Sequence, residues 1–285
     1  MRISSWEMFS DSLIRNGKYF EVEKSTAQMK FKTERGNFEY IERGKGAIPM
    51  NELYFIGMVK KHTDSLDLNF EVEREKIKYF SIPKHRENVF FNCFEIDLSA
   101  AYWNFAYAEG LLSKELYERG KTVSKRTRLA SLGAIAKITT HMVFDGKRWL
   151  TPKITEAPKA NYFFHVANRI AELMQILESL AFHDFIFFWC DAIFVKPESL
   201  STILDYLEMN EVGCSCFLVD SIEYKFNEGY ISVISEQWRE KKKEKEPERI
   251  FYFKKEDKDL FEKTALKSNH KKSNIINKPN EIIPF

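Results

Sequence analysis

Runs of apolar residues divide the second half of the chain into well-defined elements. Residues 89–98 and 185–196 are almost continuously apolar and rich in β-forming side chains, which predicts two buried strands. Between them, residues 165–181 repeat apolar side chains at helical spacing and predict an amphipathic helix. Its expected buried face carries Val166, Ile170, Leu173, Leu177 and Leu180.

Shorter patterns predict the other elements. We expect helices at the start of the chain and over residues 100–114, 125–138 and 199–209, with a weak point at Gly110 and a polar segment over 118–124. Strands are expected over 19–24, 36–43 and 52–59, whereas residues 71–82 fit a helix or a charged edge strand equally well. Two hairpins are predicted, with turns at Asp145-Gly146 and at residues 227–229. The tail beyond Ala265 is expected to be poorly ordered.

Composition places the chain among globular proteins. Its 285 residues are 44% hydrophobic and 15% aromatic, enough for a substantial core, and the formal net charge is only +2. The basic residues are unevenly distributed, however, with concentrations over 114–148 and 239–249 that suit contact with phosphates. The four cysteines form no CxxC pair and no stretch reaches the length of a membrane span. We expect a cytoplasmic protein with reduced thiols, or one made in a host cytoplasm, and no membrane partner.

Two aspartates stand out against the apolar runs. Asp97 ends one predicted strand and Asp191 interrupts the other. An ionised carboxylate in such surroundings is costly unless it is paired, hydrogen-bonded or bound to a metal. An Asp that caps the following helix is the alternative for Asp97. Two carboxylates on adjacent strands can bind two Mg²⁺ or Mn²⁺ ions, with a backbone carbonyl such as that of Leu98 and nucleotide oxygens completing the shell.

Three segments then resemble motifs of family B DNA polymerases. Residues 97–103 (DLSAAYW) resemble the first palm motif, residues 125–133 (KRTRLASLG) resemble the fingers-helix motif, and residues 188–195 (FWCDAIFV) resemble the third motif. The resemblance covers roughly residues 90–196. It implies that Asp97 and Asp191 are the catalytic metal ligands, that Tyr102 lies under the incoming sugar, and that Lys125 grips the triphosphate of a dNTP.

The resemblance also implies an architecture. We expect an α+β fold, with a palm-like antiparallel sheet covered by helices and reduced fingers. The corresponding segments are a mixed α/β region over 1–88, a palm over 89–236 with a fingers insertion at about 104–140, and a charged thumb-like segment with the tail over 237–285. No proofreading exonuclease fits into the first 90 residues. The source suggested is a phage, plasmid or other mobile element.

Basic residues near these motifs are candidates for nucleotide or nucleic-acid contacts. Arg119 and Arg128 join Lys125 as candidates for the nucleotide, and Lys121 and Arg126 are candidates for the primer-template. Lys241, Lys242 and Lys243 suit a duplex as part of a thumb. The alternative for these side chains is a solvated helix surface, which is the more frequent role of such residues. A priming or accessory protein is a further expected partner.

Several positions depart from the family pattern. Trp189 stands where the family has the first acid of the third motif, and Leu129, Leu132 and Trp103 replace an Asn, a Tyr and a Pro. The changes at Trp189 and Leu129 motivate a first alternative, a catalytically inactive palm that binds nucleic acid or acts as a scaffold. Residues 96–105 (IDLSAAYWNF) also resemble the first motif of reverse transcriptases, so a reverse-transcriptase-like polymerase is a second alternative. The third is an unrelated α+β protein in which Asp97 and Asp191 are structural. The reverse-transcriptase motif needs two adjacent acids, and Cys190 occupies the first of those positions.

Overall fold

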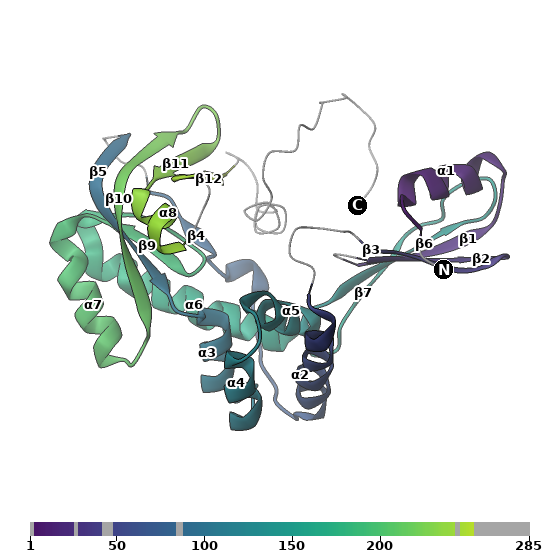
Figure 1. The fold of residues 1–285 in the computed structure, drawn as a ribbon, viewed down its shortest axis with the longest axis horizontal. Coiled ribbons are helices and arrows are strands. Elements are labelled where there is room, and N and C mark those ends of the chain that lie inside the picture. The colour runs from purple at the N-terminus through teal and green to yellow at the C-terminus, as the bar shows by residue number, and fades with distance from the viewer. Residues whose placement is uncertain (1–2, 26–27, 42–47, 84–87, 243–245, 254–285) are drawn as a thin grey trace. The chain divides into compact units, whose positions relative to one another are not determined.

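The chain folds into two compact units. The computed structural model describes residues 3–25, 28–41, 48–83, 88–242 and 246–253. Unit 1 comprises Met1–Lys78 with Ala100–Leu173, and unit 2 comprises Tyr79–Ser99 with Met174–Phe285. Among the described residues the fold is α+β, with one antiparallel sheet in each unit and eight α-helices (Figure 1). The predicted palm, fingers and thumb-like boundaries stay predictions.

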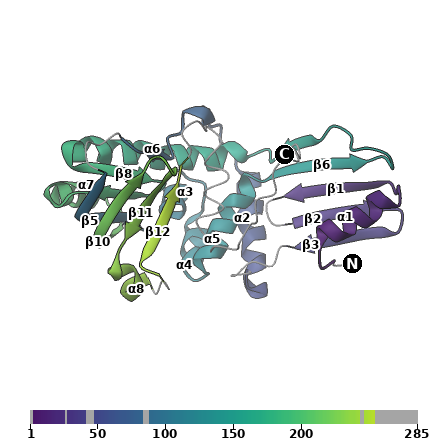
Figure 2. The same ribbon diagram turned by 90° about the horizontal axis from the view of Figure 1, so that it is seen from above.

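Unit 1 contains a five-stranded sheet covered by a helix. The sheet has the order β3-β2-β1-β6-β7. Its strands are β1 (Phe20–Ser25), β2 (Gln28–Thr33), β3 (Gly36–Ile41), β6 (Ile138–Phe144) and β7 (Lys153–Glu156). The predicted initial helix is α1 (Trp6–Arg15), which lies across the sheet (Figure 2) and packs Phe9 against Phe31 and Phe38. The turn expected at Asp145-Gly146 is present, and it leads from β6 to a single bridge between Phe144 and Trp149.

The remaining part of unit 1 is helical. It contains α2 (Leu53–Ser65), α3 (Ala101–Ala108), α4 (Lys114–Lys121), α5 (Lys125–Ile135) and the first part of α6 (Ala160–Ala181). The expected break at Gly110 separates α3 from α4, whereas the polar segment 118–124 is largely the end of α4. The strand predicted over 52–59 was wrong. Phe55, Val59 and Thr63 are buried at intervals of four residues, so the segment buries one helical face instead of alternate positions.

Unit 2 is a seven-stranded antiparallel sheet with the order β12-β11-β10-β5-β9-β8-β4. Its strands are β4 (Phe80–Ser81), β5 (Val89–Leu98), β8 (Phe185–Trp189), β9 (Ala192–Val195), β10 (Cys214–Lys225), β11 (Tyr230–Ile234) and β12 (Glu248–Tyr252). The helices are α7 (Leu200–Met209), α8 (Glu236–Lys242) and the end of α6. The central strands β10-β5-β9-β8, with α6 and α7 in the connections, have the β-α-β-β-α-β order of a split β-α-β motif.

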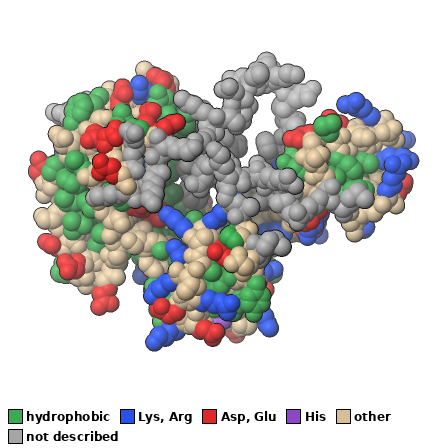
Figure 3. All heavy atoms as spheres, viewed as in Figure 1, with side chains coloured by type: hydrophobic (Ala, Val, Ile, Leu, Met, Phe, Trp, Pro, Cys, Tyr) green, Lys and Arg blue, Asp and Glu red, His purple; other side chains and the backbone are tan. Residues whose placement is uncertain are grey.

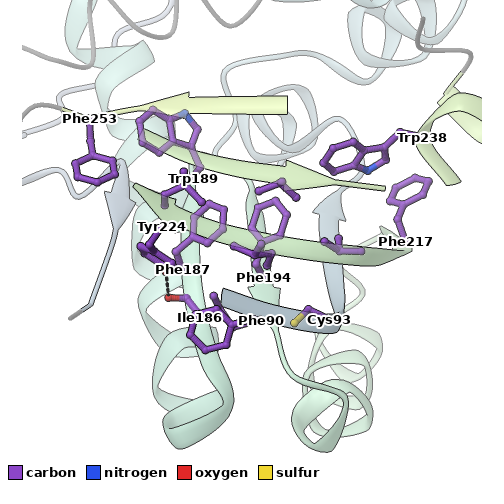
Figure 4. Close-up of a cluster of buried hydrophobic side chains, with 14 residues drawn as sticks. Phe90, Cys93, Ile186, Phe187, Trp189, Phe194, Phe217, Tyr224, Trp238 and Phe253 are labelled. Carbon is purple, nitrogen blue, oxygen red and sulfur yellow. Dashed lines mark hydrogen bonds between the residues drawn. The ribbon is translucent and has the colours of Figure 1, made fainter. Parts of the chain in front are cut away.

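The seven-stranded sheet curls over an aromatic core. In a flat sheet β12 would lie about 24 Å from β8, five strand spacings away. Instead the Phe251 ring of β12 lies 5.5 Å from that of Phe187 and 5.7 Å from those of Trp189 and Phe194. Figure 4 shows the buried side chains against which Phe251 packs, among them Phe187, Trp189 and Phe194. In that cluster the buried Tyr224 hydroxyl donates to the carbonyl of Ile186 at 2.8 Å.

Other sequence predictions have mixed outcomes in unit 2. The hairpin at residues 227–229 and the helix over 199–209 are present as β10-β11 and α7. The run 185–196, expected to be one strand, is a hairpin of β8 and β9 with a turn at Cys190-Asp191. On α6, Val166, Ile170, Leu173 and Leu177 are buried as predicted, whereas Leu180 is exposed. Residues 71–82 form a 3₁₀ turn and β4 instead of a helix or a long edge strand. The predicted tail lies outside the described residues.

Among the described helices, none combines the length and the apolar character needed to cross a membrane.

A buried ion pair of Glu95 and Arg249 lies on the concave side of the sheet. The Glu95 carboxylate, 1% exposed, accepts hydrogen bonds from Arg249 Nη1 at 2.9 Å and from Trp238 Nε1 at 2.5 Å. The Arg249 guanidinium also lies 3.9 Å from the centre of the Trp238 ring. These contacts tie α8 and β12 to β5, and they satisfy a carboxylate that would be strongly destabilising without partners.

Replacing Arg249 with Ala is therefore expected to lower the free energy of unfolding by about 3 kcal/mol, because a buried carboxylate loses its cation. Urea unfolding followed by circular dichroism measures the effect. Lys225→Ala is the matched control, since it removes the cation of a more exposed pair with Glu223 in the same unit, and it should unfold close to wild type. Equal stability of Arg249→Ala and Lys225→Ala would contradict the assigned role of the Glu95 group.

Candidate active site

Asp97 lies near the end of β5, the central strand of the sheet in unit 2. Its partners across the two ladders are Ala192 of β9 and Ser215 of β10. Residues directly opposite each other in antiparallel strands share a face, so Asp97 lies between two small side chains. One step along the same face, Glu95 lies between the buried rings of Phe194 and Phe217. Large buried rings therefore flank β5 at Glu95, whereas only small side chains flank it at Asp97.

Asp191 is the second residue of the tight turn between β8 and β9. The turn contains only Cys190 and Asp191, because Trp189 and Ala192 are already paired. Cys190 has a φ of 54°, a left-handed conformation that two-residue hairpin turns require at their first position. A backbone hydrogen bond joins the turn to β5, because the amide of Leu98 donates to the carbonyl of Asp191 at 2.9 Å. The structure thus brings Asp97, Leu98 and Asp191 together at the same end of neighbouring antiparallel strands.

The surroundings of the two aspartates are partly shielded from water. Both residues are half-buried, and the Leu98 side chain is buried. Burial, and secondarily the negative charge of Asp191, raise the pKa of the Cys190 thiol well above its usual range. The Cys190 thiol therefore stays neutral around neutral pH.

The donor set fits a hard divalent cation. Carboxylate oxygens are the ligands that Mg²⁺ prefers, and protein sites for this ion commonly use one or two carboxylates and retain several waters. Among the residues that the structure describes, no group of three or more His, Cys, Asp and Glu side chains is arranged to hold a metal. An ion at Asp97 and Asp191 would accordingly take its other ligands from a backbone carbonyl, such as that of Leu98, from water and from a nucleotide.

Trp189 belongs to the aromatic core. The side chain is only 6% exposed, its ring stacks on Phe80 at 5.0 Å, and it lies 5.7 Å from Phe251. The position at which the family pattern has its first acid is thus occupied by a core side chain. Trp189 contributes packing at the base of the turn instead of a third carboxylate.

The residues predicted to contact a nucleotide lie in unit 1. Tyr102, in the first turn of α3, is half-buried and stacks on Phe163 at 5.7 Å. Lys125 is exposed at the first position of α5, after the N-cap Ser124. Arg128 is half-buried and donates from Nη1 to the carbonyl of Gly120 at 3.0 Å and to that of Val123 at 3.3 Å. These two bonds give Arg128 a structural role in joining α4 to α5.

The other predicted site residues, Arg119 for the nucleotide and the rest for nucleic acid, differ in their surroundings. Arg119 and Arg126 are exposed, and Lys121 is exposed and paired with Glu118 at 2.8 Å. Lys241 and Lys242 belong to α8, although their side chains lie outside the described part of the structure, and Lys243 lies outside the described residues altogether.

Sequence reasoning missed two acidic residues that organise the structure. Glu95 is one, and its signal was present, since a Glu two residues before Asp97 in a buried strand also needs a partner. Glu52 is the other. Its carboxylate accepts hydrogen bonds from the hydroxyls of Ser124 and Thr127, which lowers its pKa, and so joins the start of α2 to the start of α5. Glu52 had been assigned to a strand.

A cavity of about 470 Å³ lies elsewhere in unit 1 and contains none of the predicted site residues. Its lining combines Lys60, Lys137 and Lys159 with Asp64 and Glu156, so that opposite charges largely balance. The mixed lining favours no particular ligand.

Comparison of the chain with protein-family models, with curated proteins and with solved structures found no match. The geometry at Asp97 and Asp191 is therefore the basis for assigning a function.

Introducing two residues of the family B pattern by mutation should distinguish the core position 189 from the surface position 129. Trp189→Asp is expected to destabilise the protein by at least 3 kcal/mol, because it removes a buried indole and places a carboxylate among aromatic rings. Leu129→Asn is the matched control. Leu129 is 46% exposed on α5, so a change of no more than about 1 kcal/mol is expected. Thermal and urea unfolding measure both; a stable Trp189→Asp protein would show that position 189 tolerates the acid.

Proposed function

We propose that this chain catalyses template-directed nucleotidyl transfer, as a DNA polymerase-like enzyme with a palm built on the seven-stranded sheet of unit 2. The observation that carries the proposal is the placement of Asp97 at the end of β5 beside Asp191 in the β8-β9 turn. The resemblance of residues 97–103, 125–133 and 188–195 to three polymerase motifs supports it independently. The order of elements, with a helix before the hairpin that carries Asp191, is in keeping with it.

Asp97 and Asp191 would hold two Mg²⁺ or Mn²⁺ ions, which when bound supply activation of a 3′-hydroxyl and stabilisation of charge on the leaving pyrophosphate. The task of this chain is to hold the two carboxylates in fixed positions. β5 does so for Asp97 because it is paired on both sides, by β9 and β10. The tight turn and its hydrogen bond to Leu98 do so for Asp191. The neighbours of Asp97 across the two ladders, Ala192 and Ser215, have small side chains.

Two residues of unit 1 complete the proposal. Tyr102, whose ring is supported by Phe163, is proposed to select against a 2′-hydroxyl on the incoming sugar. Lys125 is proposed to contact the triphosphate as a flexible point charge. Arg128, in contrast, donates hydrogen bonds to the carbonyls of Gly120 and Val123, so we propose that its role is to stabilise the α4-α5 connection.

A second candidate function is a catalytically inactive palm that binds nucleic acid. The observation that favours it is the burial of Trp189 in the core, since this position then supplies no carboxylate next to Asp191. The two candidates differ in one measurable property, which is whether the protein incorporates nucleotides.

Primer extension on a labelled hairpin with dNTPs and Mg²⁺ or Mn²⁺ tests the proposal. Wild type should extend the primer, and Asp191→Asn should reduce the rate by about 10³-fold or more, equivalent to roughly 4 kcal/mol of transition-state stabilisation. Asp97→Asn should have a similar effect, and EDTA should abolish activity. Asp205→Asn, which removes an exposed carboxylate from α7 in the same unit, is the control and should match wild type.

Wild-type protein that binds the hairpin without extending it would support the inactive palm. Extension by Asp191→Asn at the rate of Asp205→Asn would exclude Asp191 as a catalytic ligand.

Lys125→Ala should slow nucleotide incorporation by roughly 10²–10³-fold, because it removes one charge-assisted contact to the triphosphate. Single-turnover incorporation measures the rate, and fluorescence anisotropy with the hairpin tests whether nucleic-acid binding persists. Lys114→Ala is the control, since Lys114 is exposed at the start of α4 and carries the same charge. A Lys125→Ala protein with the wild-type incorporation rate would refute the fingers-helix assignment.

A further inference from the structure

The end of α4, the start of α5 and the start of α2 form a basic corner in unit 1. We define the α4-α5 corner by its exposed members Tyr54, Arg119, Lys121, Lys125 and Arg126. Residues 114–128 carry six Lys or Arg against two Glu, although the whole chain is nearly neutral. Figure 3 shows Lys and Arg side chains over this part of the molecule. Such a local excess of positive charge favours a polyanion.

Local contacts make the corner a defined surface. The Glu52 carboxylate, at the start of α2, accepts from the hydroxyl of Ser124, the N-cap of α5, at 2.7 Å. Arg128 joins the end of α4 to the start of α5 through the carbonyls of Gly120 and Val123. Gly120 itself packs against Trp103, where a side chain would collide with the indole. The exposed Lys and Arg side chains of the corner are therefore carried by a backbone that these contacts stabilise.

An exposed aromatic side chain lies among these cations. Tyr54 is 66% exposed, and the Arg119 guanidinium lies 5.6 Å from the centre of its ring. Close by along α4, the Lys121 ammonium lies 4.5 Å from the Tyr117 ring, which in turn stacks on Tyr107. Aromatic rings that alternate with cations are typical of surfaces that bind single-stranded nucleic acid, since the cations follow the phosphates and the rings stack on unpaired bases.

We propose that the α4-α5 corner binds single-stranded nucleic acid, with Tyr54 stacking on an unpaired base and Arg119, Lys125 and Arg126 contacting the phosphates. Only the identity of the bound strand rests on the proposed function, under which it is the unpaired template. Duplex is the poorer ligand, because its bases are already stacked and leave no face for Tyr54. Lys125 would then contact a template phosphate in the absence of dNTP and the triphosphate in its presence.

Binding of a fluorescent oligo(dT) of 20 nucleotides, measured by anisotropy between 50 and 300 mM salt, tests the proposal with the full chain. Tyr54→Ala should weaken binding about 10-fold, the loss expected for one stacked base, whereas Tyr54→Phe should bind like wild type. Affinity for a duplex of the same length should be unchanged by Tyr54→Ala. These outcomes together assign Tyr54 to base stacking and not to folding.

The phosphate contacts have their own test. The double variant Arg119→Gln with Arg126→Gln should reduce the slope of log affinity against log salt by about 1.4, because each contact to a single strand contributes about 0.7. The double variant Lys18→Gln with Lys30→Gln is the matched control, since both lysines are exposed in unit 1 away from the corner, and its slope should equal that of wild type.

Two results would overturn the proposal. One is equal oligo(dT) affinity for Tyr54→Ala, Tyr54→Phe and wild type; the other is equal salt slopes for the two double variants. Failure of the proposed function gives a different result. A wild-type protein that shows the Tyr54 effect on oligo(dT) yet extends no primer would refute polymerase activity and retain the binding surface.

Discussion

The pairing of β5 with strands on both sides is the interaction on which the candidate site depends. β9 and β10 together pair with β5 along most of its length, so the backbone at Asp97 is held from two directions. The β8-β9 turn is hydrogen-bonded to the same strand through the amide of Leu98, so the backbone at Asp191 is fixed relative to that at Asp97. The pairing of β5 and the attachment of the turn therefore hold both residues at the same end of neighbouring strands.

The composition of the concave face explains why the site is at the end of the sheet. Rings from β8, β9, β10 and β12 fill the curl, and the Glu95 carboxylate of β5 lies among them with Arg249 and Trp238 as hydrogen-bond donors. Beyond Glu95 the neighbours of β5 become Ala192 and Ser215, and the aromatic filling stops. The same strand thus carries one carboxylate paired inside the core and another that is half-buried beside small side chains.

Periodicity predicted the elements whose burial is regular, including the strand 89–98 and the helix α6. Periodicity did not predict features that depend on a single turn residue or on a partner residue far away in the sequence. The turn at Cys190-Asp191 lacks the Gly or Asn that usually marks a left-handed position, so an apolar run concealed a hairpin. Residues 52–59 have β-forming side chains but pack one helical face. Asp97 and Asp191 were found as charges in apolar runs, whereas the pair of Glu95 and Arg249, 154 residues apart, follows only from the curl of the sheet.

The burial of Trp189 changes how the departure from the family pattern is understood. Position 189 supplies no carboxylate beside Asp191, which is why its burial favours the inactive palm as the second candidate. Because the indole instead packs between Phe80 and Phe251, the residue completes the core under the turn that carries Asp191. A tight turn with a left-handed non-Gly residue is costly by itself, and packing beneath it offsets that cost. Trp189 therefore supports the turn in which Cys190 and Asp191 lie, and this packing role holds for either candidate function.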